Sequence, residues 1–277
     1  MKKLRVGFQG EHGAFSEQAA FKHFGTSVET VASRSIREVF NLTEVGSTEA
    51  GVVPIENSIE GSVSETYDML LTSSVKVVGE VAVRVVHCLV ALPTAKLAEV
   101  KVIYSHPQAL AQCRNFVAAL QAEPRVAYDT AGSAKMIRDE RMVGAAAIAS
   151  ERAAEIYGLK VLKKGIEDYG RNFTRFLIIS KSEGRRRRDC KTSVIFSVPH
   201  TPGSLYNVLE VLARAKINLT KIESRPTRQR PWEYYFFVDF EGHHRGRDVS
   251  KAFAEVATKT IFLKVLGSYP RSKEELL

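Results

Sequence analysis

Runs with strand character and runs with helical character alternate along the first 180 residues, and no other feature of the sequence restricts the fold as strongly. The β-rich runs lie at 4–8, 27–32, 51–54, 100–105, 125–128, 145–148 and 176–180. The helical runs lie between them at 15–24, 35–43, 64–71, 107–120, 131–138 and 150–157. Strands that alternate with helices in this way form parallel sheets with helices packed on their faces. We therefore predict an α/β fold for this part of the chain.

The segment 75–92 departs from this rhythm, because it is β-prone throughout, with valines on one face over most of its length. We predict a long strand that leaves a first lobe, formed by about 1–76 and 172–180, and enters a second lobe, 77–171. The segment 172–180 then provides the return crossing. Two lobes that are joined by two crossings leave a cleft, which is a common position for a small-molecule site. His87 lies on the valine face, so we expect a core histidine rather than a catalytic one.

The composition changes at 181–191, a segment that we interpret as a basic linker. Beyond it, strand and helix patterns follow one another in the order βαββαβ, which is the ferredoxin-like arrangement. Their positions are 192–198, 204–215, 217–225, 234–241, 248–257 and 260–267. We therefore expect two domains, at 1–180 and 192–277.

The formal net charge is +9, since 40 lysine and arginine residues face 31 aspartate and glutamate residues. Four of these positive charges are consecutive, at Arg185–Arg188. The run could bind nucleic acid or direct nuclear import, but no aromatic residues interleave with it and no nucleic-acid-binding fold surrounds it. A solvated linker is the better interpretation, and we expect no nucleic-acid partner.

Several features favour a cytoplasmic protein without a membrane segment. The apolar stretch at the N-terminus ends at Gln9 and Glu11, short of a secretory signal, and no run approaches membrane-spanning length. Cys88, Cys113 and Cys190 form no C-x-x-C pair and are odd in number. They support neither a disulfide framework nor a cysteine-rich zinc site.

The common catalytic motifs are missing from the sequence. It contains no H-E-x-x-H, G-x-S-x-G or Walker motif and no set of residues with metal-ligand spacing. Gly7, Gly10 and Gly13 follow a predicted strand, but their G-x-x-G-x-x-G spacing does not match the dinucleotide fingerprint. They indicate either a turn that approaches a ligand or a plain tight turn. We expect no metal and no other cofactor.

Small polar residues occupy four predicted transitions from strand to helix. These transitions are 10–16, 56–58 with Ser62, 105–108 and 130–133. In α/β lobes such turns lie at the carboxyl ends of the strands, where the N–H groups of a helix are available to an anion. Helix capping alone explains any single one of them, but several that face one cleft would suit a carboxylated ligand.

Arg175 lies between Phe173 and Phe176 at the start of an apolar strand, where an unpaired guanidinium group would be costly. Two interpretations remain open for it. The group either grips the carboxylate of a ligand or pairs with a glutamate or aspartate of the protein.

Five segments of the first domain carry a resemblance to a known family. They are GFQGEHGAFSE from Gly7, VVPIENSIEGSVSETYDML from Val52, YSHPQALAQC from Tyr104, GAAAIAS from Gly144 and NFTRF from Asn172. With these segments the chain resembles prephenate dehydratases from Leu4 to about Pro270. TPGSLYNVL from Thr201 and ESRP from Glu223 resemble an amino-acid-binding ACT domain. The departures from the family pattern are mild: Phe15 stands in place of Tyr in the first domain, and Ser204 in place of Ala in the second.

The resemblance implies a two-lobed, periplasmic-binding-protein-like catalytic domain with a cleft, followed by a ferredoxin-like βαββαβ ACT domain. The family reaction converts prephenate to phenylpyruvate, with loss of water and carbon dioxide, in L-phenylalanine biosynthesis. The resemblance implies that Thr174 is the catalytic residue at the departing hydroxyl group and that Arg175 is a carboxylate ligand. Residues implied in substrate binding are Asn57, Ser58, Ser105, Gln112 and Asn172, with Glu56 beside them.

The chemistry of threonine limits the role of Thr174. A threonine hydroxyl is a very weak acid, so we prefer Thr174 as an oriented hydrogen-bond donor that stabilises the leaving oxygen. Full proton transfer would need help from water or a neighbour. Glu56 is the candidate, provided that its surroundings raise its pKa.

The resemblance also implies inhibition by L-phenylalanine, bound to the second domain at His200, Pro202, Gly203, Ser204, Leu205, Asn218, Leu219, Glu223, Ser224 and Arg225. A physical reason supports the first five of these positions, because prolines and a glycine shape a turn whose N–H groups and following helix can receive a carboxylate. ACT domains commonly pair, so a homodimer or homotetramer is expected.

Two alternatives remain. Arogenate dehydratases share the fold and motifs but make L-phenylalanine directly from arogenate, the amino analogue of prephenate. A non-enzymatic amino-acid-binding protein is the other alternative, since two α/β lobes around a cleft also serve that purpose.

Overall fold

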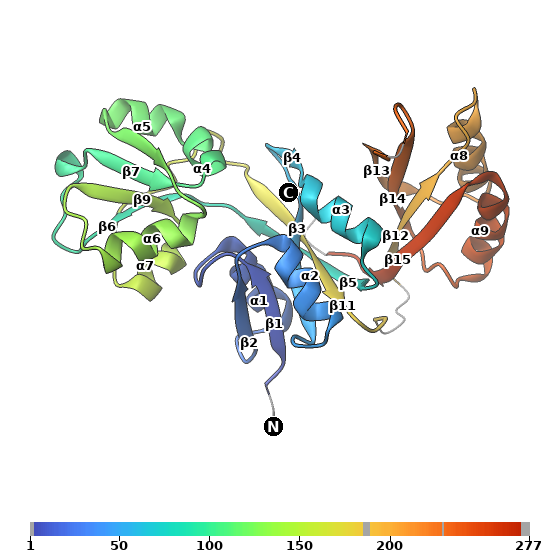
Figure 1. The fold of residues 1–277 in the computed structure, drawn as a ribbon, viewed down its shortest axis with the longest axis horizontal. Coiled ribbons are helices and arrows are strands. Elements are labelled where there is room, and N and C mark those ends of the chain that lie inside the picture. Colours follow the sequence, from blue (N-terminus) through green and yellow to red (C-terminus); the bar gives the residue numbers. More distant parts are fainter. Residues whose placement is uncertain (1–2, 185–188, 229, 273–277) are drawn as a thin grey trace. The chain divides into compact units, whose positions relative to one another are not determined.

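The computed structural model describes residues 3–184, 189–228 and 230–272, so the Arg185–Arg188 run of the predicted linker lies outside the described residues. The chain forms two compact units (Figure 1). The first consists of Met1–Met69 and Val81–Leu177, and the second of Leu70–Glu80 and Ile178–Leu277. Each unit is described by itself below.

One lobe of the first unit is built on a sheet with the order β2-β1-β3-β11-β5, in which β4 pairs with β3 at one end. The last residues of α3 and β11 and the first residues of β5 belong to the second unit. Its strands are β1 (Arg5–Gln9), β2 (Glu29–Ser33), β3 (Ala50–Asn57), β4 (Gly61–Ser62), β5 (Lys76–Arg84) and β11 (Phe173–Ser180). Its helices are α1 (Phe15–Phe24), α2 (Ile36–Glu44) and α3 (Ser64–Thr72). β1 runs parallel to both β2 and β3, and Val6 and Phe8 of β1 are completely buried.

Helix α2 shows how the local sequence produces this lobe. Ser35 caps the helix, because its hydroxyl oxygen accepts a hydrogen bond from the backbone N–H of Glu38 at 3.2 Å. The buried side chains Ile36, Val39 and Phe40 recur at helical spacing and cover the sheet.

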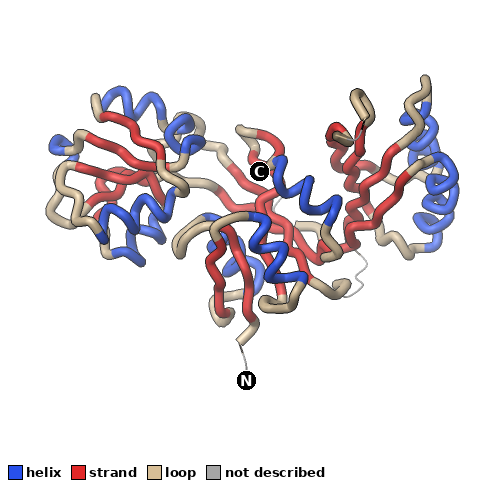
Figure 2. The backbone as a smooth tube through the Cα atoms, viewed as in Figure 1, coloured by secondary structure: helices blue, strands red, loops and turns tan. Residues whose placement is uncertain are grey.

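The other lobe of the first unit is built on a sheet with the order β10-β6-β9-β7-β8. Its strands are β6 (Cys88–Ala91), β7 (Val102–Ser105), β8 (Glu123–Val126), β9 (Ala145–Ala149) and β10 (Lys160–Lys164). Its helices are α4 (Pro107–Gln112), α5 (Arg114–Leu120), α6 (Thr130–Asp139) and α7 (Glu151–Tyr157). Helices cover both faces of this sheet, α6 and α7 on one and α4 and α5 on the other (Figure 2). The central strand β9 is therefore buried at every position.

The two lobes are joined by two crossings, as predicted, but the outgoing crossing is interrupted. The sequence predicts one strand over 75–92, whereas β5 ends at Arg84 and β6 begins at Cys88. The hydrogen-bond partners of the chain change in between, because Val85 N–H donates to Asn172 and the carbonyl of His87 accepts from Gly165 and Ile166. The helix predicted over 107–120 is likewise divided, into α4 and α5.

The second unit contains a four-stranded antiparallel sheet with the order β13-β14-β12-β15. Its strands are β12 (Cys190–Ser197), β13 (Leu219–Pro226), β14 (Tyr234–Glu241) and β15 (Phe262–Pro270), and its helices are α8 (Ser204–Arg214) and α9 (Arg247–Lys259). Both helices pack on one face of the sheet (Figure 2). The predicted βαββαβ order is confirmed.

A buried ion cluster lies in the second unit. Lys191 Nζ is 2.6 Å from Glu80 Oε2 and 3.2 Å from Asp239 Oδ2. The side chains of Lys191 and Glu80 are each only 4% exposed, so this cation and its two carboxylates depend on one another.

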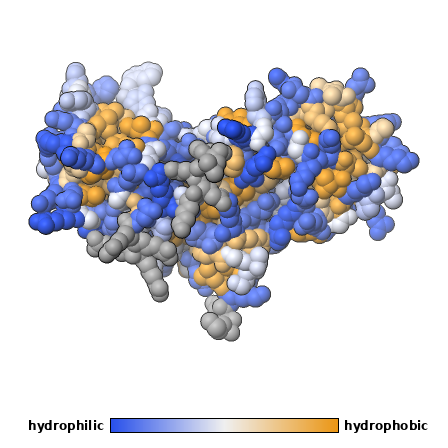
Figure 3. Space-filling model, turned by 180° about the vertical axis from the view of Figure 1, so that it is seen from behind, coloured by the Kyte–Doolittle hydropathy of each residue, from blue (hydrophilic) through white to orange (hydrophobic). Residues whose placement is uncertain are grey.

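No helix in the described ranges is long and apolar enough to span a membrane. On the face shown in Figure 3, hydrophobic residues are interspersed with hydrophilic ones.

Candidate active site

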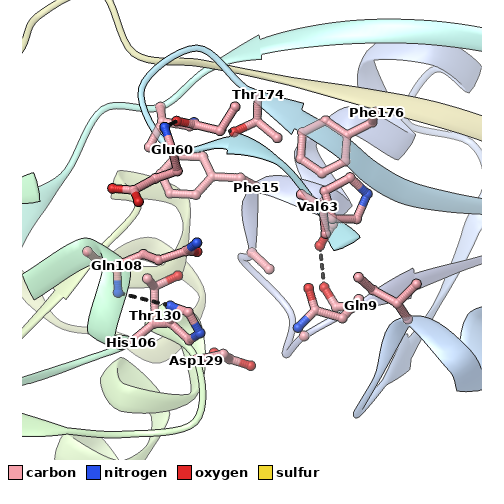
Figure 4. A pocket seen from close by; sticks show the side chains of 18 of the residues that line it. Gln9, Phe15, Glu60, Val63, His106, Gln108, Asp129, Thr130, Thr174 and Phe176 are labelled. Carbon is pink, nitrogen blue, oxygen red and sulfur yellow. Dashed lines mark hydrogen bonds between the residues drawn. The ribbon is translucent and has the colours of Figure 1, made fainter. Parts of the chain in front are cut away.

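A cavity of about 560 Å³ lies between the two lobes of the first unit. Thr174 and Phe176, from strand β11, lie on one side of it, and His106, Gln108 and Thr130, from the other lobe, lie opposite (Figure 4). The cleft that the sequence predicts between the lobes is therefore present.

Each of the four predicted strand-to-helix transitions contributes residues to the lining of this cavity. They include Ser16 at the start of α1, Ser62 before α3, His106 before α4 and Thr130 at the start of α6. The start of α2 also lines the cavity, through Arg34, Ser35 and Ile36. The amino-terminal ends of helices carry partial positive charge. Their convergence on one cavity suits an anionic ligand.

A hydrogen-bonded chain of side chains begins at Asn57, at the end of β3. Its Oδ1 accepts hydrogen bonds from the backbone N–H groups of Ile59 at 2.9 Å and Glu60 at 3.0 Å. Its Nδ2 donates to Asn172 Oδ1 at 2.7 Å and to Thr174 Oγ1 at 3.0 Å. Thr174 lines the cavity, so Asn57 links the backbone after β3 to a hydroxyl group that faces the ligand space.

The series of hydrogen-bonded side chains continues from Asn172 into the other lobe. Asn172 Nδ2 donates to Gln112 Oε1 at 2.8 Å, and His87 Nε2 lies 2.9 Å from the same oxygen. Gln112 Nε2 donates to Glu60 Oε1 at 3.4 Å. Asn172 is completely buried, so it supports the neighbouring amides from behind the lining.

His87 lines the cavity at the far end of this chain, and its ring meets the ring of Phe15 edge-on at 5.7 Å between centroids. Burial lowers the pKa of His87, while the hydrogen bond to Gln112 and the charge of Glu167 oppose this shift. Its Nδ1 is buried and has no hydrogen-bond partner among the described residues.

Arg175 follows Thr174 on β11, and its Nη2 donates to Glu56 Oε2 at 2.6 Å. The side chains are 24% and 39% exposed, respectively, and pair outside the lining of the cavity. Of the two interpretations left open for Arg175, the structure contains the pair with a protein carboxylate. In this salt bridge Glu56 accepts and orients the guanidinium group.

Two of the predicted binding residues use their hydroxyl groups on the backbone. Ser58 Oγ accepts from Phe173 N–H at 2.9 Å and donates to the carbonyl of Arg171 at 3.1 Å. Ser105 is completely buried, and its Oγ donates to the carbonyl of Ile148 at 2.7 Å. Neither residue is among the described residues that line the cavity: Ser58 joins the end of β3 to the start of β11, and Ser105 joins β7 to β9.

Comparison with known proteins gives the family. The prephenate dehydratase family model matches residues 6–184, and the ACT domain model matches residues 192–258. The chain belongs to the prephenate dehydratase family. It is 44% identical to a bifunctional chorismate mutase/prephenate dehydratase of Aquifex aeolicus over 98% of this chain and 75% of that protein. It is 41% identical to arogenate dehydratase/prephenate dehydratase 2, chloroplastic, of Arabidopsis thaliana over 97% of this chain and 73% of that protein.

Solved structures are similar over both units. Prephenate dehydratase from Arthrobacter aurescens in complex with L-Phe is 31% identical, with a TM-score of 0.88 over 98% of this chain and 91% of that chain. A structure described as a novel type of quorum-quenching acylase is 32% identical, with a TM-score of 0.88 over 97% of this chain and 98% of that chain.

Asp129 and Arg34 line the cavity of this prephenate dehydratase family member but were not singled out in the sequence, and His106, from the predicted transition 105–108, lines it with them. Asp129 caps α6 and accepts from the backbone N–H of Glu11 at 3.1 Å. Burial lowers the pKa of His106, an effect that the charge of Asp129 opposes. Arg34 is the one lysine or arginine among the described lining residues. All three lie at or just after the ends of strands, so the rule that placed the four transitions could also have found Asp129 and Arg34.

The predicted phenylalanine-binding residues lie in the second unit of this family member. Five are on the turn into α8, where Gly203 has a φ of +82°, and Thr201 Oγ1 lies 2.7 Å from Ser204 Oγ. Five are at or on β13, an edge strand of the sheet. Arg225 Nε on β13 is buried and has no hydrogen-bond partner among the described residues. Among those residues, no group of three or more His, Cys, Asp or Glu is arranged to hold a metal ion.

Proposed function

We propose that this protein is a prephenate dehydratase, which converts prephenate to phenylpyruvate, carbon dioxide and water. The observation that carries the proposal is the direction of the hydrogen bond between Asn57 and Thr174. Its Oγ1 accepts a hydrogen bond from Asn57 Nδ2, and its side chain lines a cavity that suits anions. The hydroxyl proton of Thr174 is therefore available to a ligand, which is what a departing hydroxyl group needs.

In the reaction, the bond between the ring and its carboxylate breaks, and its electron pair enters the ring as the C–O bond to the ring hydroxyl breaks. The ring becomes aromatic, and carbon dioxide and hydroxide leave. Thr174 donates a hydrogen bond to the leaving oxygen as negative charge develops on it. One proton from solvent completes the water, because threonine is too weak an acid to supply it by itself.

The cavity also suits the two carboxylates of prephenate. Phe15 and Phe176 line it, and apolar surroundings favour neutral carbon dioxide over the charged carboxylate from which it forms. Arg34 and the starts of α1, α2, α3 and α6 supply positive potential for the carboxylate that remains on the side chain. Gln112 lines the cavity and can offer an amide N–H group to the bound ligand, whereas Asn57 acts on the ligand through Thr174.

We retain Arg175 as a carboxylate ligand, oriented by Glu56, on the strength of the family resemblance. The salt bridge of 2.6 Å argues against Glu56 as the proton donor, since an ionised carboxylate accepts hydrogen bonds. Ser58, Ser105 and Asn172 then serve substrate binding by holding neighbouring strands and side chains in place.

Arogenate is the second candidate substrate, because the Arabidopsis thaliana relative carries both names. Comparing kcat/KM of the full chain for prephenate and arogenate tests both. Formation of phenylpyruvate, with the higher kcat/KM for prephenate, supports the proposal. A higher value for arogenate would make the protein an arogenate dehydratase, and binding without turnover of either compound would leave a non-enzymatic binding protein.

We also propose that L-phenylalanine inhibits the enzyme from the ACT domain, in a homodimer or homotetramer. The relative from Arthrobacter aurescens was solved with L-Phe, and Arg225 here has an unused buried N–H group. Titrating phenylalanine into the wild type and Arg225→Ala at the same prephenate concentration is the test. Weaker inhibition of the variant is expected, whereas equal inhibition would point to an effector site elsewhere, such as the catalytic cleft.

A cytoplasmic location completes the proposal. Cys88 and Cys113 are free and buried, which suits a reducing compartment.

A further inference from the structure

The orientation of each amide in the chain that ends at Thr174 is fixed by its neighbours. The orientation of the Asn57 amide is determined first, because the backbone N–H groups of Ile59 and Glu60 can only donate. The side-chain atom of Asn57 that faces them must be its oxygen. Its NH₂ group therefore faces Asn172 and Thr174, and both must accept from it.

The orientations of the Asn172 and Gln112 amides follow from that of Asn57. Asn172 accepts from Asn57 with its oxygen, so its NH₂ group faces Gln112, which in turn presents its oxygen. The NH₂ group of Gln112 then faces the carboxylate of Glu60, a group that can accept. Each donor in the chain has an acceptor, and the sequence of roles has one consistent solution.

This solution determines the state of His87. Gln112 Oε1 can only accept, so His87 Nε2, at 2.9 Å, must carry a proton. Nδ1 is buried without a partner among the described residues, so a proton there would have nothing to bind. His87 is only 3% exposed, which further disfavours the charged imidazolium. His87 is thus a neutral histidine with its proton on Nε2.

We propose that His87 is a positioning residue for the proposed dehydratase reaction. Its Nε2–H holds Gln112 Oε1 towards Asn172, and Asn172 in turn holds the Asn57 amide in place against Thr174, whose own proton is then available to a ligand in the cavity. Without the His87 donor, Gln112 Oε1 loses one of its two hydrogen bonds, and the amides that lead to Thr174 are held less firmly in place. The inference rests on the proposed function and adds a residue that the sequence pattern assigns to the core.

The test combines two substitutions at His87 with a double-mutant cycle. His87→Phe keeps an aromatic ring beside Phe15 but removes the donor, whereas His87→Gln restores an N–H at a similar reach. We expect His87→Phe to lower kcat for prephenate about 10- to 100-fold, as misplacement of a reacting group does, with KM changed less than about threefold. His87→Gln should recover most of kcat. In a Thr174→Ala background, His87→Phe should cost less than about twofold, because the residue acts through Thr174.

A matched control separates positioning from stability. Thr43→Val removes a buried hydroxyl that donates to the carbonyl of Val39 and lies 3.3 Å from Thr48 Oγ1, away from the hydrogen-bonded side chains that lead to Thr174. It should leave kcat within about twofold in both backgrounds. Wild-type enzyme without dehydratase activity would overturn the proposed function. Active wild type with an unaffected His87→Phe, or with effects of His87→Phe and Thr174→Ala that multiply, would overturn only the role of His87.

A spectroscopic measurement keeps the inference testable if His87→Phe does not fold. The ¹⁵N NMR signals of a histidine ring distinguish a protonated nitrogen from an unprotonated one. We expect His87 of the wild type to be protonated on Nε2 and unprotonated on Nδ1 at neutral pH. A proton on Nδ1, or on both nitrogens, would contradict the assignment.

Discussion

Asn57 donates a hydrogen bond from its side-chain Nδ2 to the hydroxyl oxygen of Thr174 over 3.0 Å. The relationship fixes which of the two residues is the donor, because Asn57 Oδ1 is occupied by two backbone N–H groups. The hydroxyl proton of Thr174 therefore remains available to a ligand in the cavity that Thr174 lines. The chemical proposal depends on this direction rather than on the presence of a threonine alone.

Asn57→Asp reverses the relationship with almost no change in shape. Thr174 would then donate to the new carboxylate instead of to the substrate, so we expect kcat for prephenate to fall by about 10²-fold or more. Steady-state kinetics on folded protein is the measurement. Asn41→Asp, the same chemical change at an exposed position on α2, is the control and should keep wild-type kcat. Equal activity of the two variants would show that the direction of the bond is unimportant.

Arg175→Ala should raise KM for prephenate, because a charge-assisted hydrogen bond to a carboxylate contributes roughly 1.5–3 kcal/mol. Arg175→Lys should recover only part of the loss, since an ammonium group cannot reproduce the planar fork. Glu56→Gln should raise KM less than Arg175→Ala, because it removes the partner that orients the guanidinium group but keeps that group. Unchanged KM and kcat in Arg175→Ala would remove this residue from the site.

The sequence predicts the architecture well, because alternation of patterns reports which faces are buried. It predicts the lobes, the crossings and the βαββαβ order. It does not predict the break at Val85–His87, since a valine-rich run favours strand conformation whether or not its hydrogen-bond partners change along the way.

The side-chain contacts within the candidate site could not be predicted from the sequence, for a related reason. Asn57, Gln112 and Asn172 come from three separate segments, and only folding brings them together. Similarly, the flanking phenylalanines indicate that Arg175 needs a carboxylate, but not that Glu56 supplies one.

The stability of the protein should depend on pH partly through His87. Burial lowers the pKa of His87 in the folded state below the ordinary value of 6.5, so as pH falls through that value the unfolded chain takes up a proton that the folded protein does not. The free energy of unfolding should therefore fall by up to about 1.4 kcal/mol per pH unit from this group, over a pH range that the hydrogen bond to Gln112 and the charge of Glu167 make narrower. Urea unfolding at about pH 7 and pH 5 should show a smaller loss for His87→Gln than for the wild type. His23, His106 and His244, whose pKa values burial also lowers, remain in both proteins, so identical pH dependence would contradict the assignment.

Lys191→Met should destabilise the protein by about 3–5 kcal/mol, because it leaves the buried Glu80 and the partly buried Asp239 without the cation between them. Denaturant unfolding of the second unit is the measurement. Arg214→Met, which breaks a surface pair with Glu255, is the control and should cost at most about 1 kcal/mol. A similar cost for both substitutions would mean that burial of the Lys191 cluster has no energetic consequence.

The most direct test of the proposed chemistry is kcat for prephenate in Thr174→Ala, measured beside Thr174→Ser. We expect a folded alanine variant whose kcat is lower by about 10²-fold or more, and a serine variant that retains much more activity because it keeps the hydroxyl group. Turnover of prephenate by Thr174→Ala at close to the wild-type rate would contradict the proposed chemistry.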